Sequence, residues 1–321
     1  MATITQQPAV GGTPAGLPSG EARQRTFLRL ADLLSSWAFL LPNLLGVALF
    51  VIFPVVASFV LAFLHWSGSR AEIEAIRWAG LENFRDLFAD KAFWQSMYNT
   101  LVLMLGIPLR LFGCLGIALL VNQRIREVVL YRTLFFLPTI SSATAIFILW
   151  QALYNPDVGL VNRLLAWVML DGPNWLGDPN WSKTALIVTG VWRSLGGMTM
   201  LLYLAALQGI SESLYEAADI DGASAWKRFW HVTWPLLSPT TFFVLIMGVI
   251  HGFQGGFQQA YVMTRGGPAG STMTIDFFIY NEAFFTSQRM GYASAAAWVL
   301  FAIILAVTLI QWRYGQKHVH Y

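Results

Sequence analysis

Hydrogen-bonding amides and aromatic rings are concentrated at residues 251–261, within an otherwise apolar stretch of the chain. On a continuous helix, Gln254, Gln258 and Tyr261 would lie at i, i+4 and i+7 and would share one face, with Phe257 beside them. Amide groups hydrogen-bond to hydroxyls, and aromatic rings pack on the C–H faces of a sugar. These four residues are therefore predicted to line a path for a sugar-like solute.

The same stretch has a second interpretation, which concerns helix packing. Gly252 and Gly256 are four residues apart, a spacing that lets two helices in a membrane approach closely, and the glutamines would then form hydrogen bonds between helices. In another apolar segment, Trp192 is a further candidate for the solute path. Arg193 beside it and Arg110 could contact solute, but we expect structural roles for both, such as pairing with a partner subunit or reaching the membrane interface.

No pattern for bond-breaking chemistry is visible in the sequence. None of the four lysines follows a glycine, so the chain has no Gly-x-x-x-x-Gly-Lys phosphate-binding loop. The single cysteine, Cys114, lies in an apolar run, and His318 and His320 are more typical of a terminal tail than of a metal site. We therefore expect no catalytic residue, no metal site and no cofactor in this chain, and any ATP must be used by another polypeptide.

A polar, amphipathic segment at residues 211–239, called the polar insert below, separates two long apolar segments. Ser213 and Glu216 have the Ser-x-x-Glu spacing of a capping box, in which each residue pairs with a free amide at the start of a helix. Gly222 is expected to end that helix, because glycine readily adopts the left-handed conformation that follows many helices. The polar insert thus begins with a short predicted helix.

A second short helix is predicted in the polar insert, with Ser224 as its N-cap and Pro235 at its end. Residues at helical spacing place Lys227, Arg228 and His231 on one face. The opposite face is aromatic and comprises Trp226, Phe229, Trp230, Thr233 and Trp234. The expected product is a compact helix-turn-helix beside a membrane.

The polar insert resembles the cytoplasmic "EAA" loop of ABC importer permeases, which reads E-A-A-x-x-D-G-A followed by a phenylalanine and two prolines. The matching residues are Glu216, Ala217, Ala218, Asp221, Gly222, Ala223, Phe229, Pro235 and Pro239. The resemblance implies that the residues from Glu216 to Pro235 in this set lie in a cleft of an ATPase subunit and transmit its movement. From the residues alone, an interfacial amphipathic helix or a purely capping role for Glu216 are the alternatives.

Residues 131–138 and 261–268 extend the resemblance to carbohydrate-type ABC permeases, the relatives of maltose and glycerol-phosphate permeases, over about residues 35–312. It implies a type I importer subunit that pairs with a second, homologous permease and rests on two ABC ATPase subunits, which use ATP and Mg. It also implies a sugar-like substrate delivered by an extracytoplasmic binding protein, with a glycerol phosphate or polyol as the alternative. A secondary transporter would need ionisable coupling residues at mid-membrane, and few occur; a membrane enzyme or assembly factor is more remote.

The composition of the chain is that of a membrane protein. Of its 321 residues, 56% are hydrophobic and only 12% charged, and the mean hydropathy is +0.55. Typical soluble domains have about 25% charged residues, so these charges could not cover a soluble surface. The net charge of +3 is too small and scattered to indicate nucleic-acid binding. By the resemblance, the expected location is the plasma membrane of a bacterium or archaeon, in contact with lipid.

The apolar residues fall into six runs, each near the ~20 residues that a helix needs to cross ~30 Å of hydrocarbon. The runs lie near 37–64, 96–121, 133–154, 184–208, 240–263 and 292–312. The predicted fold is therefore all-α, a polytopic membrane protein with six transmembrane helices and an uncleaved first span. This domain is predicted over 31–315, between a disordered cytoplasmic tail at 1–30 and a short cytoplasmic tail at 316–321.

The distribution of positive charge gives only a weak signal for the orientation of the six spans. Lys and Arg are nearly balanced between the two sides, but Arg23, Arg25 and Arg29 precede the first span. An even number of spans places both termini on one side, and with the resemblance we predict that this side, including the polar insert, is cytoplasmic. Residues 67–95 and 155–183 would then be folded external loops, at the lipid interface or against a binding protein.

Overall fold

A computed structural model of the chain describes residues 36–66, 76–123, 126–285 and 288–315. Residues 1–58 and 59–321 form two compact units, and each is described by itself. The tails predicted from the sequence at the two ends of the chain lie outside the described residues.

The described part of the first unit is helical. One helix extends over Ser36–Leu61 and corresponds to the first predicted span. It contains a π-helical turn, η1 (Ala48–Ile52), followed by α2 (Phe53–Leu61). Its large apolar side chains are exposed, with Phe39 at 86% and Phe50 at 82%. A long apolar helix with an exposed apolar surface is typical of a membrane span.

Near the start of the second unit, two antiparallel strands of two residues each pair with one another, β1 (Leu64–His65) and β2 (Arg77–Trp78). The all-α prediction did not include them. Stacking of Trp78 on the ring of Phe63 accompanies this pairing, with centroids 5.9 Å apart. The helices of the first half are α3 (Glu82–Ala89), α4 (Lys91–Leu103), α5 (Gly106–Val121), α6 (Val128–Ile140), α7 (Ala143–Leu153), α8 (Leu160–Trp167), α9 (Pro179–Ser194) and α10 (Met198–Gln208). Those of the second half are α11 (Glu212–Ile220), α12 (Ala225–Arg228), the π-helix η3 (Phe229–Thr233), α13 (Trp234–Leu236), α14 (Ser238–Gln254), α15 (Phe257–Met263), α16 (Ile275–Phe284) and α17 (Met290–Gly315).

Among the described residues, three helices are long and apolar enough to cross a membrane, namely Ser36–Leu61, Lys91–Val121 and Met290–Gly315. Three pairs of helices meet the same criterion together but are bent, by 95° between α6 and α7, 46° between α9 and α10, and 63° between Ala225–Leu236 and α14. If each bent pair is one span, the number is six. The prediction of a helical, polytopic membrane fold is confirmed, and two of the bends lie within the third and fourth predicted runs.

Two of the three bends can be traced to particular residues. At the end of α6, Pro138 has no N–H to donate, and the extended backbone of Ser141 and Ser142 separates α6 from α7. Between α9 and α10, a Cβ atom at Gly196 would overlap the backbone carbonyl of Phe135 in α6. Glycine is therefore required where these two segments cross, and the helix changes direction there.

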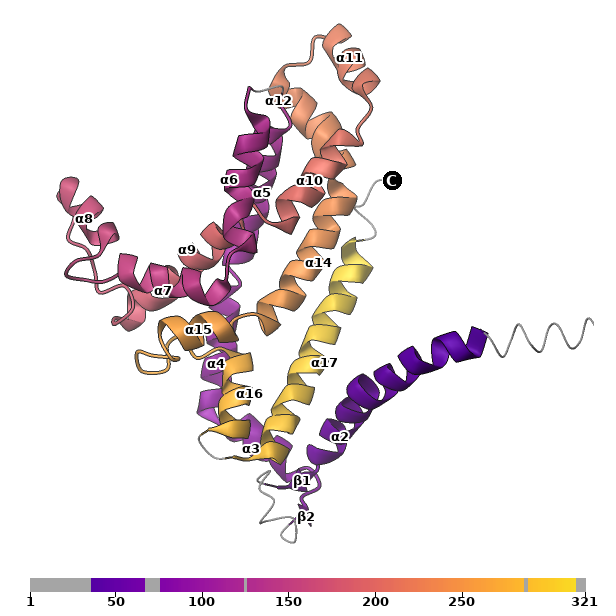
Figure 1. Cartoon of the computed structure of the whole chain (residues 1–321), viewed down its shortest axis with the longest axis vertical. Coiled ribbons are helices and arrows are strands. Elements are labelled where there is room, and N and C mark those ends of the chain that lie inside the picture. The colour runs from indigo at the N-terminus through magenta and orange to yellow at the C-terminus, as the bar shows by residue number, and fades with distance from the viewer. Residues whose placement is uncertain (1–35, 67–75, 124–125, 286–287, 316–321) are drawn as a thin grey trace, which may run out of the picture. The chain divides into compact units, whose positions relative to one another are not determined.

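Buried apolar side chains of the second unit form three clusters. One joins α4, α14, α16 and α17 around Phe93 and Phe278, and another joins α5, α10 and α14 around Tyr203. The third joins α7, α9 and α15 around Leu186 and Ala260. Within this unit, α5, α10, α14 and α17 lie side by side, with α11 and α12 at one end and α3 at the other (Figure 1).

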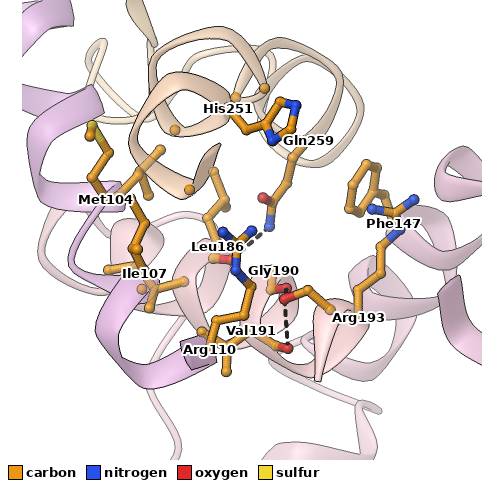
Figure 2. Close-up of a pocket in the computed structure, with 18 residues that line it drawn as sticks. Met104, Ile107, Arg110, Phe147, Leu186, Gly190, Val191, Arg193, His251 and Gln259 are labelled. Atoms are coloured by element: carbon orange, nitrogen blue, oxygen red, sulfur yellow. Dashed lines mark hydrogen bonds between the residues drawn. The ribbon is translucent and has the colours of Figure 1, made fainter. Parts of the chain in front are cut away.

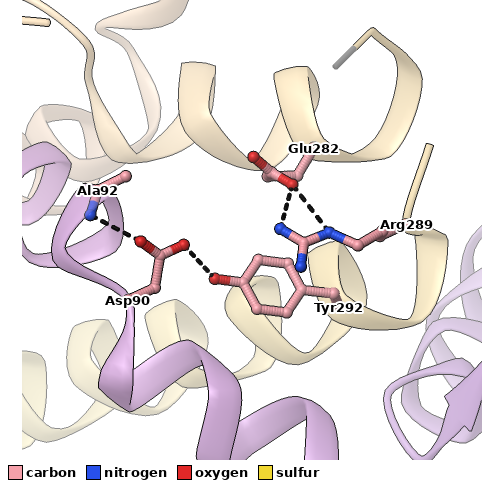
Figure 3. Close-up of polar contacts among 5 residues, drawn as sticks. All are labelled: Asp90, Ala92, Glu282, Arg289 and Tyr292. Carbon is pink, nitrogen blue, oxygen red and sulfur yellow. Dashed lines mark hydrogen bonds and ion pairs between the residues drawn. The ribbon is translucent and has the colours of Figure 1, made fainter. Parts of the chain in front are cut away.

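Polar contacts join three helices at the α3 end of the unit (Figure 3). Asp90 caps α4, because its side chain accepts from the backbone N–H of Ala92 at 2.8 Å, and it also accepts from the hydroxyl of Tyr292 in α17 at 2.7 Å. Glu282 in α16 forms an ion pair with Arg289 at 2.7 Å, and the guanidinium of Arg289 lies over the ring of Tyr292. These contacts connect the ends of α4, α16 and α17 to one another.

Candidate functional site

The polar insert begins with α11, whose start differs from the sequence prediction. The residue before the helix is Ser211, which has an extended backbone, and Ser213 is already helical. The hydroxyls of these two serines lie 2.7 Å apart, and neither caps the helix. The predicted capping box of Ser213 and Glu216 is therefore wrong, because α11 starts two residues before the position that the box requires. Glu216 is exposed, and the structure gives its carboxylate no hydrogen bond among the described residues.

The end of α11 is closed by a Schellman motif, as the sequence led us to expect for Gly222. Gly222 has φ +71°, its N–H donates to the carbonyl of Asp219 at 3.0 Å, and the N–H of Ala223 donates to the carbonyl of Ala218 at 2.9 Å. A left-handed residue flanked by these two bonds defines the motif. No atom lies within 4 Å of a Cβ built at Gly222, so its backbone conformation, not space, requires glycine.

The second helix of the polar insert starts as predicted but does not end as predicted. The side chain of Ser224 caps α12 by accepting from the N–H of Lys227 at 3.4 Å. Pro235 does not end the helix, because the chain widens into the π-turn η3 and Pro235 then lies in the first turn of α13. A proline is tolerated in a first helical turn, where its missing N–H has no partner to lose.

The two short helices are fixed to one another and to the helix bundle. Arg228 forms an ion pair with Asp219, and the hydroxyl of Tyr215 lies 3.0 Å from that of Thr233. The aromatic face that was predicted for the second helix is real, and Trp234 stacks on Phe112 of α5 with ring centroids 6.3 Å apart. The polar insert is therefore in direct contact with α5.

The residues that match the EAA pattern divide into two groups by their burial. Glu216, Ala217, Asp221 and Gly222 are exposed at the end of the unit, whereas Ala218, Ala223, Phe229 and Pro235 are half-buried. Phe229 and Trp234 pack against the cluster that joins α5, α10 and α14. The insert thus has a free outer surface and an embedded inner surface.

The predicted solute-path residues do not share one helical face. The fifth apolar run is broken at Gly255 and Gly256, so Gln254 ends α14 while Gln258 and Tyr261 belong to α15. The prediction of a continuous face was wrong because it assumed an unbroken helix through two consecutive glycines.

Each predicted path residue has its own surroundings. Gln254 and Gln258 are exposed, and the Gln258 amide donates to the hydroxyl of Thr144 at 2.9 Å. Phe257 and Tyr261 stack with centroids 5.5 Å apart. Trp192 is 42% exposed and makes an edge contact with the ring of Trp150.

The packing interpretation is supported at both glycines of the pair, but with different neighbours. A Cβ at Gly252 would lie 2.8 Å from Met104, and a Cβ at Gly256 would lie 2.7 Å from Thr274. These are two separate close contacts rather than one patch between two helices.

A cavity of about 200 Å³ is lined by residues of α4, α5, α7, α9, α14 and α15 (Figure 2). Its polar lining includes Arg110, Arg193, His251 and Gln259, and none of the five predicted path residues lines it. The Gln259 amide N–H donates to the carbonyl of Leu186 at 2.7 Å. The sequence had singled out both arginines but had no signal that α5 and α9 would bring them to one cavity.

Asp276 positions α15, a role that no local pattern in the sequence indicates. Its carboxylate accepts from the N–H of Phe257 at 2.7 Å and from the N–H of Phe277 at 3.0 Å. Burial raises the pKa of the Asp276 carboxyl, and the hydrogen bonds it accepts oppose that rise. In the described part of the chain, no group of three His, Cys, Asp or Glu side chains could hold a metal ion.

Comparison with known proteins places this fold in a family. Residues 112–317 match the family described as "Binding-protein-dependent transport system inner membrane component". The chain is 37% identical over 296 residues to the probable ABC transporter permease protein YesP of Bacillus subtilis (strain 168), which covers 90% of this chain and 93% of that protein. It is 34% identical over 282 residues to the lactose transport system permease protein LacF of Rhizobium radiobacter, covering 86% of this chain and 92% of that protein.

The fold is also similar to that of a solved transporter. A chain of a bacterial alginate ABC transporter, crystallised in complex with an alginate pentasaccharide-bound periplasmic protein, matches with a TM-score of 0.76 and 25% identity. The match covers 89% of this chain and 96% of that chain. Because the family match spans more than half of the sequence, this multi-pass membrane protein belongs to the family of binding-protein-dependent transport system inner membrane components.

Proposed function

We propose that the chain is a permease subunit of an ATP-driven importer and forms part of the path of a sugar-like solute through the membrane. The observation that carries this proposal is the polar insert, which is exposed on its outer surface and packed into the helix bundle on its inner surface. Such an element is suited to receive force from a soluble partner and pass it to the membrane helices.

In this proposal the outer surface contacts an ABC ATPase. The contact residues are Glu216, Ala217, Ala218, Asp221, Gly222, Ala223, Phe229 and Pro235, with the exposed members touching the ATPase and the half-buried members transmitting its movement. Closure of two ATPase subunits around ATP and Mg would shift the insert. The embedded rings of Phe229 and Trp234 would then displace α5, α10 and α14, against which they pack.

Displacement of these helices would change the solute path. Helices α5 and α14 also supply Arg110 and His251 to the cavity, so the insert and the cavity share two structural elements. A second, homologous permease would complete the path, with Gln254, Phe257, Gln258, Tyr261 and Trp192 as exposed or half-buried candidates for its lining. Exposed amides and rings within a membrane segment support that assignment.

The substrate class is supported by the relatives. LacF is named for lactose transport, and the solved structure is of an alginate ABC transporter in complex with an alginate pentasaccharide-bound periplasmic protein. We infer a sugar delivered by an extracytoplasmic binding protein, with a glycerol phosphate or polyol as the alternative within the carbohydrate-type group. We further propose that both termini and the polar insert are cytoplasmic and that the chain itself carries out no bond-breaking step.

Purification and reconstitution test the proposal. The chain, produced with the permease and ATPase subunits of the same organism, should retain the ATPases through purification. In proteoliposomes with the matching binding protein, the complex should import a sugar only when ATP is supplied. Retention of no ATPase, or solute uptake driven by an ion gradient without ATP, would contradict it.

A further inference from the structure

The cavity lined by α4, α5, α7, α9, α14 and α15 contains positive charge without a negative partner. The Nε atoms of Arg110 and Arg193 are buried, and neither has a hydrogen-bond partner among the described residues. No carboxylate of the described residues lies within 4 Å of either guanidinium, and no Asp or Glu lines the cavity. The arginines come from different helices, α5 and α9, and both reach this space (Figure 2).

Both arginine side chains are half-buried, and their buried Nε atoms have lost water without gaining a partner. An arginine within a membrane bundle is costly without a counter-charge. Arginine is also the side chain best suited to hold a planar or tetrahedral anion, because its N–H donors form a fixed fork. A cavity with two such groups is therefore suited to an anion.

The rest of the lining matches a small sugar ring. Leu103 and Ile107 supply apolar surface, and the oxygen of Gln259 can accept from a hydroxyl. The ring of Phe147 lies under the guanidinium of Arg193, with the Cζ atom 5.9 Å from the ring centroid. Gly248 leaves room for Arg110, since a Cβ there would lie 3.0 Å from Nη2 of its guanidinium. At about 200 Å³ the cavity is smaller than the roughly 300–1,000 Å³ of drug-sized ligand sites, which favours one sugar unit at a time.

We propose that this cavity binds the anionic group of a sugar-derived substrate, a carboxylate, sulfonate or phosphate, with Arg110 and Arg193 as its charge partners and Gln259 as a hydroxyl partner. The proposal rests on the proposed function, because it specifies which solute the permease path accepts. It assigns to both arginines a role that the sequence alone did not favour.

The test uses the complete complex in lipid nanodiscs without the binding protein. Equilibrium binding is measured for three anions, galacturonate, sulfoquinovose and glycerol 3-phosphate, and for their neutral counterparts galactose, glucose and glycerol. At least one anion should bind more tightly than its counterpart by roughly ten- to a hundredfold, the range expected for a hydrogen bond to a charged group. The anion that shows this preference identifies which of the three groups the cavity takes.

Matched variants connect the preference to the cavity. Arg110→Gln and Arg193→Gln should each abolish most of it, and the corresponding lysine variants should retain part of it. Lys183→Gln removes one positive charge from α9, and since Lys183 does not line the cavity this variant should bind like the wild type.

Assembly and thermal unfolding of the same variants are measured as well, to distinguish a folding defect from a loss of anion binding. If the arginines bind a solute anion and pair with no acid of the protein, the glutamine variants should assemble fully. Their melting temperature should equal or exceed that of the wild type. Loss of the second permease from either glutamine variant would instead indicate pairing with an acid of that subunit, and would overturn the proposal.

The inference and the proposed function can fail separately. A wild-type complex that imports a neutral sugar with ATP but shows no anion preference would overturn the inference and leave the permease function intact. Retention of the preference in both glutamine variants would also overturn it. Anion binding that depends on the arginines, without any ATP-dependent uptake, would support the anion-binding inference and contradict the proposed importer function.

Discussion

The carboxylate of Asp276 accepts a hydrogen bond from the backbone N–H of Phe257 at 2.7 Å, across the break in the fifth apolar run. This bond satisfies a free amide at the start of α15 and ties that helix to the first turn of α16. The glycines before Phe257 permit the break, and Asp276 fixes where the chain resumes as a helix.

Asp276→Ala should destabilise the protein, because the N–H of Phe257 would lose its acceptor in a partly buried position. An unsatisfied buried donor costs about 1–3 kcal/mol, so thermal unfolding of the purified complex should occur at a lower temperature. Asp276→Asn keeps one acceptor oxygen and should lose less. Equal melting temperatures for the alanine variant and the wild type would show that the bond does not stabilise α15.

Gly222→Val should weaken the attachment of the ATPase, whereas Gly222→Asn should not. Both side chains have space, since no atom lies within 4 Å of the Cβ position, but only asparagine tolerates the φ of +71°. A left-handed backbone costs other residues about 1–2 kcal/mol, and valine more because it is β-branched. The measurement is the ATPase retained per permease after purification, and identical retention in both variants would argue against a role for the turn.

Glu216→Lys should uncouple ATP hydrolysis from uptake while the membrane helices remain assembled. The side chain of Glu216 is exposed and has no hydrogen bond in the described part of the chain, so its loss should cost the fold little. Ser213→Lys places the same charge elsewhere on α11 and serves as the control. If both lysine variants transport normally, Glu216 does not contact the ATPase.

Gln258→Leu should reduce uptake severalfold without impairing assembly, if Gln258 contacts solute. A lost hydrogen bond to bound substrate is worth about 0.5–1.5 kcal/mol. Thr144→Val removes only the partner of the Gln258 amide and should therefore leave uptake closer to normal. Normal uptake by Gln258→Leu together with reduced assembly would favour the packing interpretation.

Cysteine labelling should establish the orientation of the chain. In a Cys114→Ala background, which removes the single native cysteine, Asp86→Cys in α3 should react with an impermeant thiol reagent added outside the cell. Ala225→Cys in α12 should react only after the membrane is made permeable. Both positions are exposed, so reactivity reports the side of the membrane. The reverse pattern would place the polar insert outside and remove the coupling proposal.

The sequence by itself determined the class of fold and the position of the polar insert. Six apolar runs of near-spanning length can be read from hydropathy, because the bilayer requires long apolar helices whatever their neighbours are. The helix end at Gly222 and the cap at Ser224 were also predictable, because each depends only on residues a few positions apart in the chain. Where two local signals competed, at Ser211 and Ser213, the prediction was wrong.

Only the tertiary structure decided where the helices break and which side chains meet. Gly196 is a glycine because the carbonyl of Phe135, in another helix, passes over it, and no periodicity in the sequence records that contact. Asp276 accepts a hydrogen bond from the first N–H of α15, a helix that precedes it in the chain. Arg110 and Arg193 reach one cavity from α5 and α9. These relationships depend on how distant helices pack, and packing is set by the shapes of many side chains together rather than by the spacing of a few.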